Sequence, residues 1–177
     1  MTQKASHSTT SPSQLARFLG AILSVALAAG WYAAYVARES VIRPVCKINP
    51  EHCSIQLINA LDRSAVTNYH AAADYWSFGT EYLAGALAVG VATGIAFYRR
   101  RISILTLELW ILLQATLMNG ALNECIRLWI QRPRPFVYLD PIGQGGAAAH
   151  YTSFYSGHTS FAALAATCAV MTSRRWI

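Results

Sequence analysis

Three arginines and a short Ser-Gly-His run are the residues of this chain best suited to phosphate chemistry. Arg127, Arg132 and Arg134 fall within eight consecutive residues. A planar guanidinium carries five N–H donors and can grip two phosphate oxygens at once. Arginines at a membrane boundary also anchor to lipid headgroups, so these three residues alone fit either role.

The second group, Ser156-Gly157-His158, stands at the expected start of a helix. The first turn of a helix offers unpaired backbone N–H groups and the positive end of the helix dipole, where an anion can dock. Gly157 allows close approach, Ser156 adds a hydroxyl, and the imidazole of His158 suits proton transfer near neutral pH. The alternative is that Ser156 only caps the helix and His158 is an interfacial polar residue.

Long apolar segments must hold these residues in place. Charged residues make up 12% of the 177 residues, about half the ~25% of a soluble domain. The hydrophobic set reaches 54%, with a mean hydropathy of +0.31. The net charge of +6 comes from basic residues that interrupt apolar runs instead of clustering on a polar face. This pattern favours a lipid bilayer and argues against nucleic acid as a partner.

The apolar runs predict an all-α, multi-pass transmembrane helical bundle. A run of about 20 apolar residues crosses a bilayer. Residues 1–14 are expected to be a disordered polar tail, and residues 15–177 a membrane domain. Ala26-Leu27-Ala28 resembles a signal-peptide cleavage site, but the apolar run continues past it, which favours an anchor. The four expected spans cover residues 15–36, 82–98, 102–130 and a stretch that begins at 159.

The intervening residues 38–74 are expected outside the membrane. Ile55, Ile58 and Leu61 have helical spacing there and predict a short interfacial helix. The three consecutive arginines at 99–101 are the densest charge in the shortest loop, which favours a cytoplasmic N-terminus. The chain is thus expected to be an integral membrane protein, of the cell inner membrane if bacterial, with the Ser-Gly-His group on the outer face.

The four cysteines divide into two pairs under this topology. Cys46 and Cys53 face an oxidising compartment and either form a disulfide or remain free. Cys125 and Cys168 lie in or near spans and are expected to be buried thiols. No cluster of cysteine, histidine or carboxylate has the spacing of a metal site, and we expect no metal or cofactor.

Taken together, the arginines and the Ser-Gly-His run resemble the type 2 phosphatidic acid phosphatase family, which belongs to the superfamily of the vanadium haloperoxidases. The family pattern is Lys-x6-Arg-Pro, then Pro-Ser-Gly-His, then Ser-Arg-x5-His-x3-Asp, on a bundle of usually six membrane helices. Arg127 stands in the place of the Lys, Arg134-Pro135 matches Arg-Pro, and Tyr155 replaces the first residue of the second motif.

The resemblance implies a membrane phosphatase that hydrolyses a phosphomonoester or pyrophosphate on a lipid. Arg127, Arg134, Ser156 and Gly157 would bind the phosphate. His158 would be the general acid that protonates the leaving alkoxide. The partners would be a membrane lipid phosphate as substrate and the bilayer itself.

The third motif, whose His is phosphorylated in the family, is not found in these 177 residues. Ser173-Arg174 begins like it but directly follows the fourth apolar helix, on the opposite side of the membrane from the other motifs. His150 has no acidic partner at useful spacing and is a weak candidate for the nucleophile. We therefore expect the N-terminal part of such an enzyme, truncated before the third motif. Without a nucleophile the covalent route is lost, although phosphate binding can survive.

Two other functions remain open. One is a non-catalytic membrane protein, a pseudophosphatase, that binds anionic lipid headgroups through the same residues. The other is a small transporter or bundle subunit in which Glu108, inside a span, carries the functional charge. Glu108 lies about two turns from the arginines at 99–101, and snorkelling toward that end of its helix is the simpler interpretation.

Overall fold

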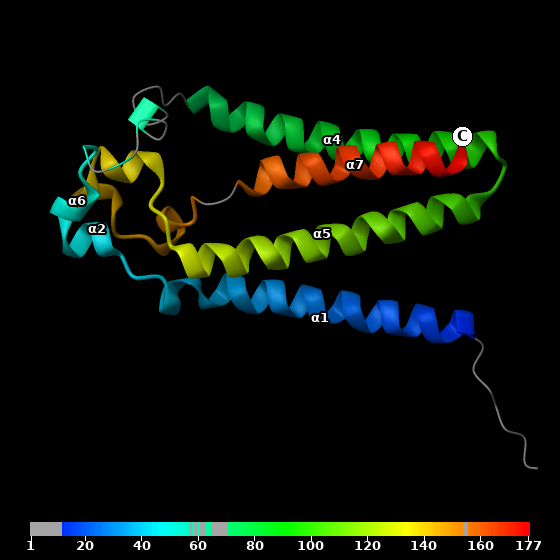
Figure 1. Ribbon diagram of the computed structural model, residues 1–177, viewed down its shortest axis with the longest axis horizontal. Coiled ribbons are helices and arrows are strands. Elements are labelled where there is room, and N and C mark those ends of the chain that lie inside the picture. The colour runs from blue at the N-terminus through cyan, green and yellow to red at the C-terminus, as the bar shows by residue number, and fades with distance from the viewer. Residues whose placement is uncertain (1–11, 57, 59, 61–62, 65–70, 154–155) are drawn as a thin grey trace, which may run out of the picture.

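The computed structural model describes residues 12–56, 58, 60, 63–64, 71–153 and 156–177, and these residues contain helices but no strand. Long helices run side by side along the molecule, and short helices gather beyond one end (Figure 1). The expected all-α helical bundle is confirmed. The long helices are α1 (Pro12–Val41), α4 (Ala71–Tyr98), α5 (Ile102–Ile130) and α7 (Gly157–Trp176). The short ones are α2 (Val45–Ile48), η1 (Pro50–Cys53), η2 (Pro135–Tyr138), α6 (Pro141–Gln144) and η3 (Ala148–Tyr151).

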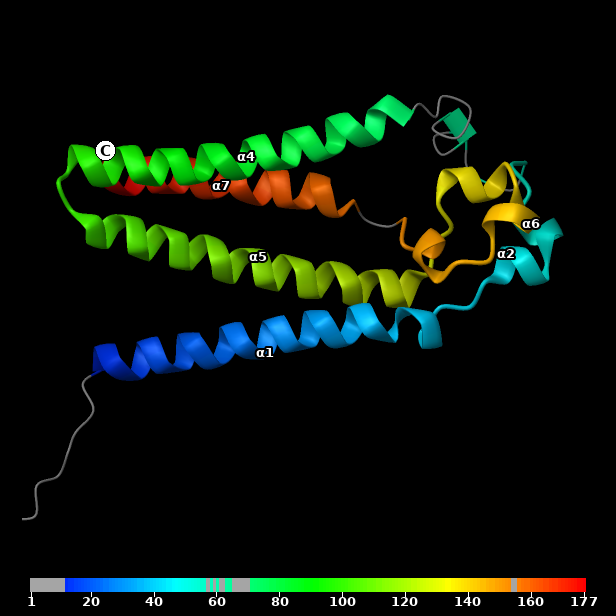
Figure 2. The ribbon, with the colours of Figure 1, turned by 180° about the vertical axis from the view of Figure 1, so that it is seen from behind.

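Helix α5 is the central element of the bundle. It packs against α1 on one side and against α4 and α7 on the other, and α4 and α7 lie along each other (Figure 2). The approach of α1 to α5 depends on Gly120, because a Cβ there would come within 2.6 Å of the Trp31 ring. Nearby, the amide of Gln114 on α5 donates a hydrogen bond of 3.2 Å to the carbonyl of Gly20 on α1.

Three segments of the described chain are long and apolar enough to cross a membrane: Gln14–Ile48, Tyr75–Tyr98 and Ile102–Tyr138. The third predicted span, residues 102–130, coincides with α5. The second begins earlier than predicted, because α4 starts at Ala71 and the aromatic residues Tyr75, Trp76 and Phe78 belong to it. The predicted fourth span is a 20-residue helix, α7, which is not among these three segments.

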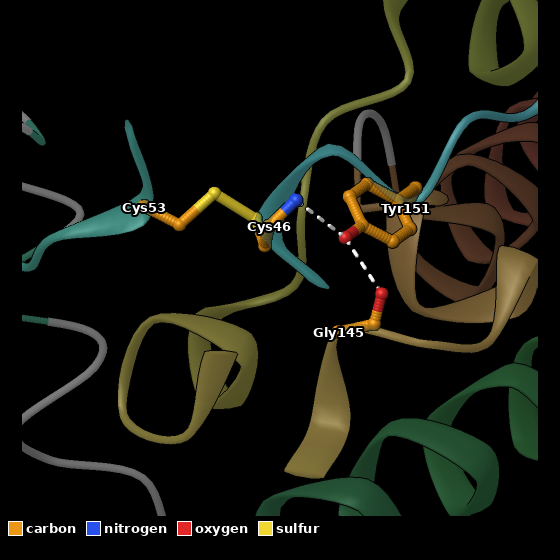
Figure 3. The surroundings of a disulfide bond; sticks show 4 residues. All are labelled: Cys46, Cys53, Gly145 and Tyr151. Carbon is orange, nitrogen blue, oxygen red and sulfur yellow. Dashed lines mark hydrogen bonds between the residues drawn. A yellow bond between two sulfur atoms is a disulfide. The ribbon is translucent and has the colours of Figure 1, made fainter. Parts of the chain in front are cut away.

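A disulfide-linked cap covers one end of the bundle, which we call the disulfide end. Cys46 and Cys53 form the disulfide, one of the two outcomes that the sequence left open. The Cys46 N–H donates to the Tyr151 hydroxyl at 3.0 Å, and that hydroxyl donates to the Gly145 carbonyl at 2.8 Å (Figure 3). Both cysteines and Tyr151 are buried in one cluster with Val137. The cap therefore fixes the α5–α7 loop to the end of α1.

Other sequence predictions are corrected by the fold or fall outside it. Cys125 is exposed on α5 and Cys168 is half-buried, so the prediction of two buried thiols is wrong. Glu108 does not reach solvent: it is buried and accepts hydrogen bonds from the last turns of α7, which supply donors at that end of the bundle. The polar tail at residues 1–11, Leu61 of the interfacial helix and Tyr155 lie outside the described residues.

Candidate functional site

The C-terminal half of α5 presents a polar face toward the inside of the bundle. Asn119, Asn123 and Arg127 follow one another at a spacing of four residues, which places their side chains on the same side of the helix. Asn123 is 3% exposed and the neighbouring Glu124 is 4% exposed. Arg38 of α1 and Ser160 of α7 hydrogen-bond to this part of α5.

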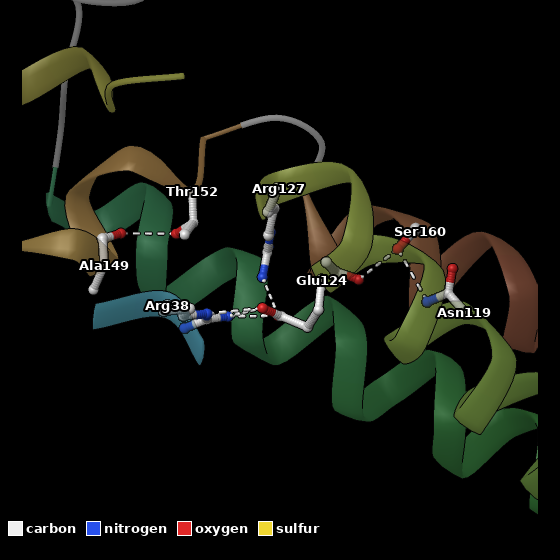
Figure 4. A network of polar contacts seen from close by, with 8 residues as sticks. Arg38, Asn119, Glu124, Arg127, Ala149, Thr152 and Ser160 are labelled. Atoms are coloured by element: carbon white, nitrogen blue, oxygen red, sulfur yellow. Dashed lines mark hydrogen bonds and ion pairs between the residues drawn. The ribbon is translucent and has the colours of Figure 1, made fainter. Parts of the chain in front are cut away.

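Glu124 is the centre of an ion-pair network that joins α1 to α5. Arg38, near the end of α1, donates from Nε and Nη2 to the Glu124 carboxylate at 2.7 and 2.5 Å. Arg127 donates from Nη1 to the same carboxylate at 3.0 Å (Figure 4). A buried carboxylate is stable only when it is paired and hydrogen-bonded. Glu124 thereby holds the guanidinium of Arg127 at a fixed position in the interior.

The loop after α5 brings Arg134 back toward the same region. The helix ends at Gln131, which adopts the left-handed conformation with φ of 48° and donates its N–H to the Arg127 carbonyl. Pro133 and Pro135 prevent the helix from continuing. The Arg134 N–H donates to the His150 carbonyl at 2.7 Å, so a hydrogen bond joins the first and last parts of the loop at this residue.

The first turn of α7 supplies the remaining site residues. Ser156 is the N-cap, and its hydroxyl accepts the Thr159 N–H at 3.3 Å. His158 lies 3.4 Å from a carboxylate oxygen of Glu81 through its Nε2 atom. The ring of Phe78, one turn earlier on α4, meets the imidazole edge-on with 4.3 Å between centroids. Two residues of α4 thus hold the ring of His158.

Four of the five residues predicted to bind or protonate a phosphate line one cavity of about 480 Å³: Arg127, Arg134, Gly157 and His158. Gly157 is close to Arg127, since a Cβ there would lie 3.2 Å from its Nη2 atom. The other polar lining residues are Glu81, Thr116, Asn119, Asn123 and Glu124, and the apolar wall is Trp31, Gly120 and Phe161 with Phe78.

The remaining candidates from the sequence lie away from this cavity. Ser156 caps α7, yet that bond uses an oxygen lone pair and leaves the hydroxyl proton to donate. His150 contacts the Gln144 carbonyl and packs on Phe136, so its ring is held in the cap. Ser173-Arg174 is at the other end of α7, about 24 Å from His158 at ~1.5 Å per helical residue.

Sequence reasoning missed the carboxylates and the arginine that support the site. Arg38, Glu81 and Glu124 were not among the predicted site residues. A signal was available, because each is an ionisable residue in or beside an apolar span, where a charge is costly unless it has a partner. No group of three metal-ligating side chains occurs in the part of the chain that the structure describes.

The comparison with known families agrees with this geometry. Residues 108–177 match the family model of the PAP2 superfamily. The matched stretch contains most of α5, the cap loop and α7, and therefore all four cavity residues predicted to act on phosphate. This part of the chain is similar to the PAP2 superfamily, and the resemblance seen in the motifs is confirmed. No curated protein and no solved structure matches the chain.

Proposed function

We propose that this chain binds the phosphate group of a membrane lipid in the cavity at the disulfide end and takes part in its hydrolysis as a PAP2-type lipid phosphatase. The observation that carries the proposal is the convergence of Arg127, Arg134, Gly157 and His158, from two helices and a loop, on one cavity. Residues separated by up to 31 positions in sequence meet there (158 − 127 = 31). The family match supports a phosphate-bearing substrate.

The donors of the cavity suit a phosphate dianion. The guanidinium groups of Arg127 and Arg134 can each donate two N–H groups to phosphate oxygens. The first turn of α7 adds backbone N–H groups and the positive end of the helix dipole. Gly157 leaves room for the oxygens because it carries no side chain.

In this proposal His158 acts as the proton donor. When the bond between phosphorus and the ester oxygen breaks, the leaving alkoxide needs a proton to become a neutral alcohol. An imidazolium at His158 supplies it and becomes a neutral imidazole, while the phosphoryl group passes to a nucleophile and finally to water. The Nε2 atom of His158 lies 3.4 Å from a carboxylate oxygen of Glu81, and this contact orients the ring. This step balances as a phosphomonoester plus water giving an alcohol plus phosphate.

A lipid substrate is supported by the apolar side of the cavity and by the bundle around it. Trp31, Phe78 and Phe161 line the wall beside the donors and come from three helices, two of which are long and apolar enough to span a membrane. An acyl or prenyl chain can lie against such a wall while its headgroup reaches the arginines. The disulfide at this end supports an outer-face location, with the N-terminus in the cytoplasm.

Binding and turnover test the proposal separately. We expect the purified chain in detergent to bind orthovanadate, a phosphate mimic, saturably, and Arg134→Gln to weaken binding. Arg17→Gln, an exposed residue of α1 that lines neither this cavity nor the one at the other end of the bundle, is the matched control and should leave it unchanged. Phosphate released from phosphatidic acid or a prenyl pyrophosphate, and lost in His158→Ala, would support hydrolysis. Absence of saturable vanadate binding would refute the proposal.

A second function has one observation in its favour. Among the described residues, His158 is the single imidazole that lines the cavity. A phosphohistidine route needs a nucleophile as well as an acid, so binding of anionic lipid headgroups without hydrolysis is the alternative. Vanadate binding that depends on Arg134, together with no phosphate release from either lipid, would favour this alternative.

A further inference from the structure

A second cavity of about 580 Å³ lies at the opposite end of the bundle, which we call the arginine end. Its walls come from the turn between α4 and α5 and from the last turn of α7, which meet at this end in both views (Figure 1, Figure 2). Four arginines line it together with an indole: Arg99, Arg101, Arg174, Arg175 and Trp176.

A buried carboxylate organises this second cavity. Glu108 of α5 is 7% exposed and accepts a hydrogen bond of 2.8 Å from the Thr172 hydroxyl. The same carboxylate accepts from Arg175 at 3.1 Å and from the Trp176 indole at 2.8 Å. Arg99 then donates from Nε to the Trp176 carbonyl at 3.0 Å. The positions of two of the four guanidinium groups are thus set by bonds to the bundle.

The other two guanidinium groups are available for a ligand. Arg101 and Arg174 are exposed, and their side chains make no hydrogen bond or ion pair with any other described residue. With Arg100 in the same turn, five arginine side chains of the α4–α5 turn and the last turn of α7 stand against one carboxylate side chain, Glu108, a local excess of four positive side-chain charges (5 − 1 = 4). The described walls of the cavity contain no acidic side chain.

We propose that the cavity at the arginine end binds the phosphate headgroup of an anionic membrane lipid. Basic pockets between membrane helices are typical binding places for anionic headgroups, and each arginine near the surface adds to the attraction. The apolar wall contributed by Ile104 and Trp176 is suited to the glycerol and upper acyl region of the same molecule. Arginines that only set the orientation of helices in a membrane do not need fixed positions. Here the Glu108 carboxylate and the Trp176 carbonyl fix Arg175 and Arg99 at the wall of one cavity.

This site is distinct from the one on which the proposed function rests. Its lining contains no histidine, serine or cysteine, so it has neither a proton donor near neutral pH nor a nucleophile. The chemistry it supports is binding without bond cleavage. An anionic lipid held there would link the α4–α5 turn to α7, the helix whose opposite end carries His158.

Lipid retention measured by native mass spectrometry tests the proposal. The full chain is reconstituted in nanodiscs of phosphatidylcholine with 20% phosphatidylglycerol or 20% cardiolipin, on the order of the charge in natural membranes. We expect wild-type protein to retain anionic lipid, and Arg101→Gln/Arg174→Gln to retain about tenfold less. The matched control is Arg43→Gln/Lys47→Gln, which removes the same two charges from exposed residues at the disulfide end. Equal loss in both double variants, or no loss in either, would overturn the proposal.

Two further arms separate the source of the phosphate and the role of the buried carboxylate. Glycerol 3-phosphate that displaces the lipid at equal concentration would overturn the assignment to a lipid, because a membrane ligand owes part of its affinity to the chain. Glu108→Gln, which keeps its shape but weakens the hold on Arg175, should reduce retention about threefold with unchanged helix content by circular dichroism. Unchanged retention in a folded Glu108→Gln protein would contradict the construction of the site described here.

Discussion

Each end of α5 carries a buried glutamate paired with an arginine, but the residues around the two pairs differ. At each end a buried glutamate accepts bonds from an arginine that lines a cavity: Glu124 with Arg127 at the disulfide end, and Glu108 with Arg175 at the arginine end. Of the two cavities, only the one at the disulfide end also contains an imidazole. Arginines held in fixed positions are sufficient to bind an anion. Hydrolysis of a phosphate ester would also need a proton donor, which at the disulfide end would be His158 of α7.

The glutamates differ also in how deeply their partners are buried. The side chains of Arg38 and Arg127 are 16% and 15% exposed, whereas Arg175 is 45% exposed. A half-exposed guanidinium that loses its partner can turn toward water. A buried one cannot, so its uncompensated charge destabilises the folded state.

The largest expected effect is therefore on stability, from Glu124→Ala. This change leaves two buried arginines without their carboxylate and should lower the free energy of unfolding by about 3–5 kcal/mol. Glu108→Ala should cost about 1–3 kcal/mol, because Arg175 can be solvated and mainly the bonds from Thr172 and Trp176 are lost. Unfolding in mixed detergent, followed by circular dichroism, measures both. Equal losses would contradict the contrast between the two ends.

The next effect is on anion binding at the disulfide end. Arg134→Gln removes a charged bidentate donor and should weaken orthovanadate binding by about 10- to 100-fold, as expected for charge-assisted hydrogen bonds. Isothermal titration calorimetry on the detergent-solubilised chain gives the affinity. Arg17→Gln, at an exposed position of α1 outside both cavities, is the control with the same loss of charge. A similar loss in both variants would mean that net charge, and not the cavity, governs binding.

Removal of the disulfide should have a comparable but smaller effect. Cys46→Ser/Cys53→Ser opens a short covalent loop of the cap and should cost about 2 kcal/mol of stability. Because Cys46 also holds Tyr151, the loop that carries Arg134 should loosen, and vanadate affinity should fall with it. The arginine end, which the cap does not contact, should retain its lipid as in the wild-type chain. Unchanged vanadate affinity would show that the cap does not position Arg134.

The smallest expected effect comes from Gly157→Ala. The added Cβ would lie 3.2 Å from Nη2 of Arg127, so the guanidinium must move by a few tenths of an ångström. We expect vanadate affinity to fall about two- to fivefold, well short of the ~100-fold cost of a 1 Å misplacement of a reacting group. Gly146→Ala, where a Cβ meets only the flexible Lys47 side chain at 3.5 Å, is a matched control. An equal effect of both changes would exclude close packing at Gly157 as the cause.

Much of the bundle and part of the site follow from local sequence signals. Hydropathy and the arginine and proline stops define α5 residue by residue, and the motif spacing selects Arg127, Arg134, Gly157 and His158. The start of α4 was placed 11 residues late (82 − 71 = 11), because polar residues near Tyr75 resemble a loop when the neighbouring helix is not visible.

The supporting residues could not be found in the same way. The pairs Arg38–Glu124 and Glu81–His158 join residues 86 and 77 positions apart (124 − 38 and 158 − 81), and no local pattern encodes which helices meet. The same holds for Glu108, whose partners lie 64 to 68 positions away on α7. These residues are recognisable in sequence only as charges in apolar surroundings. Their partners require the three-dimensional packing.

The most direct test of the central claim is an experimental structure of the chain with orthovanadate. The account predicts density for the anion in the cavity at the disulfide end, within hydrogen-bonding distance of Arg127, Arg134 and the first turn of α7, and next to His158. Density confined to the arginine end, or an anion held by Arg132 outside the cavity, would contradict it.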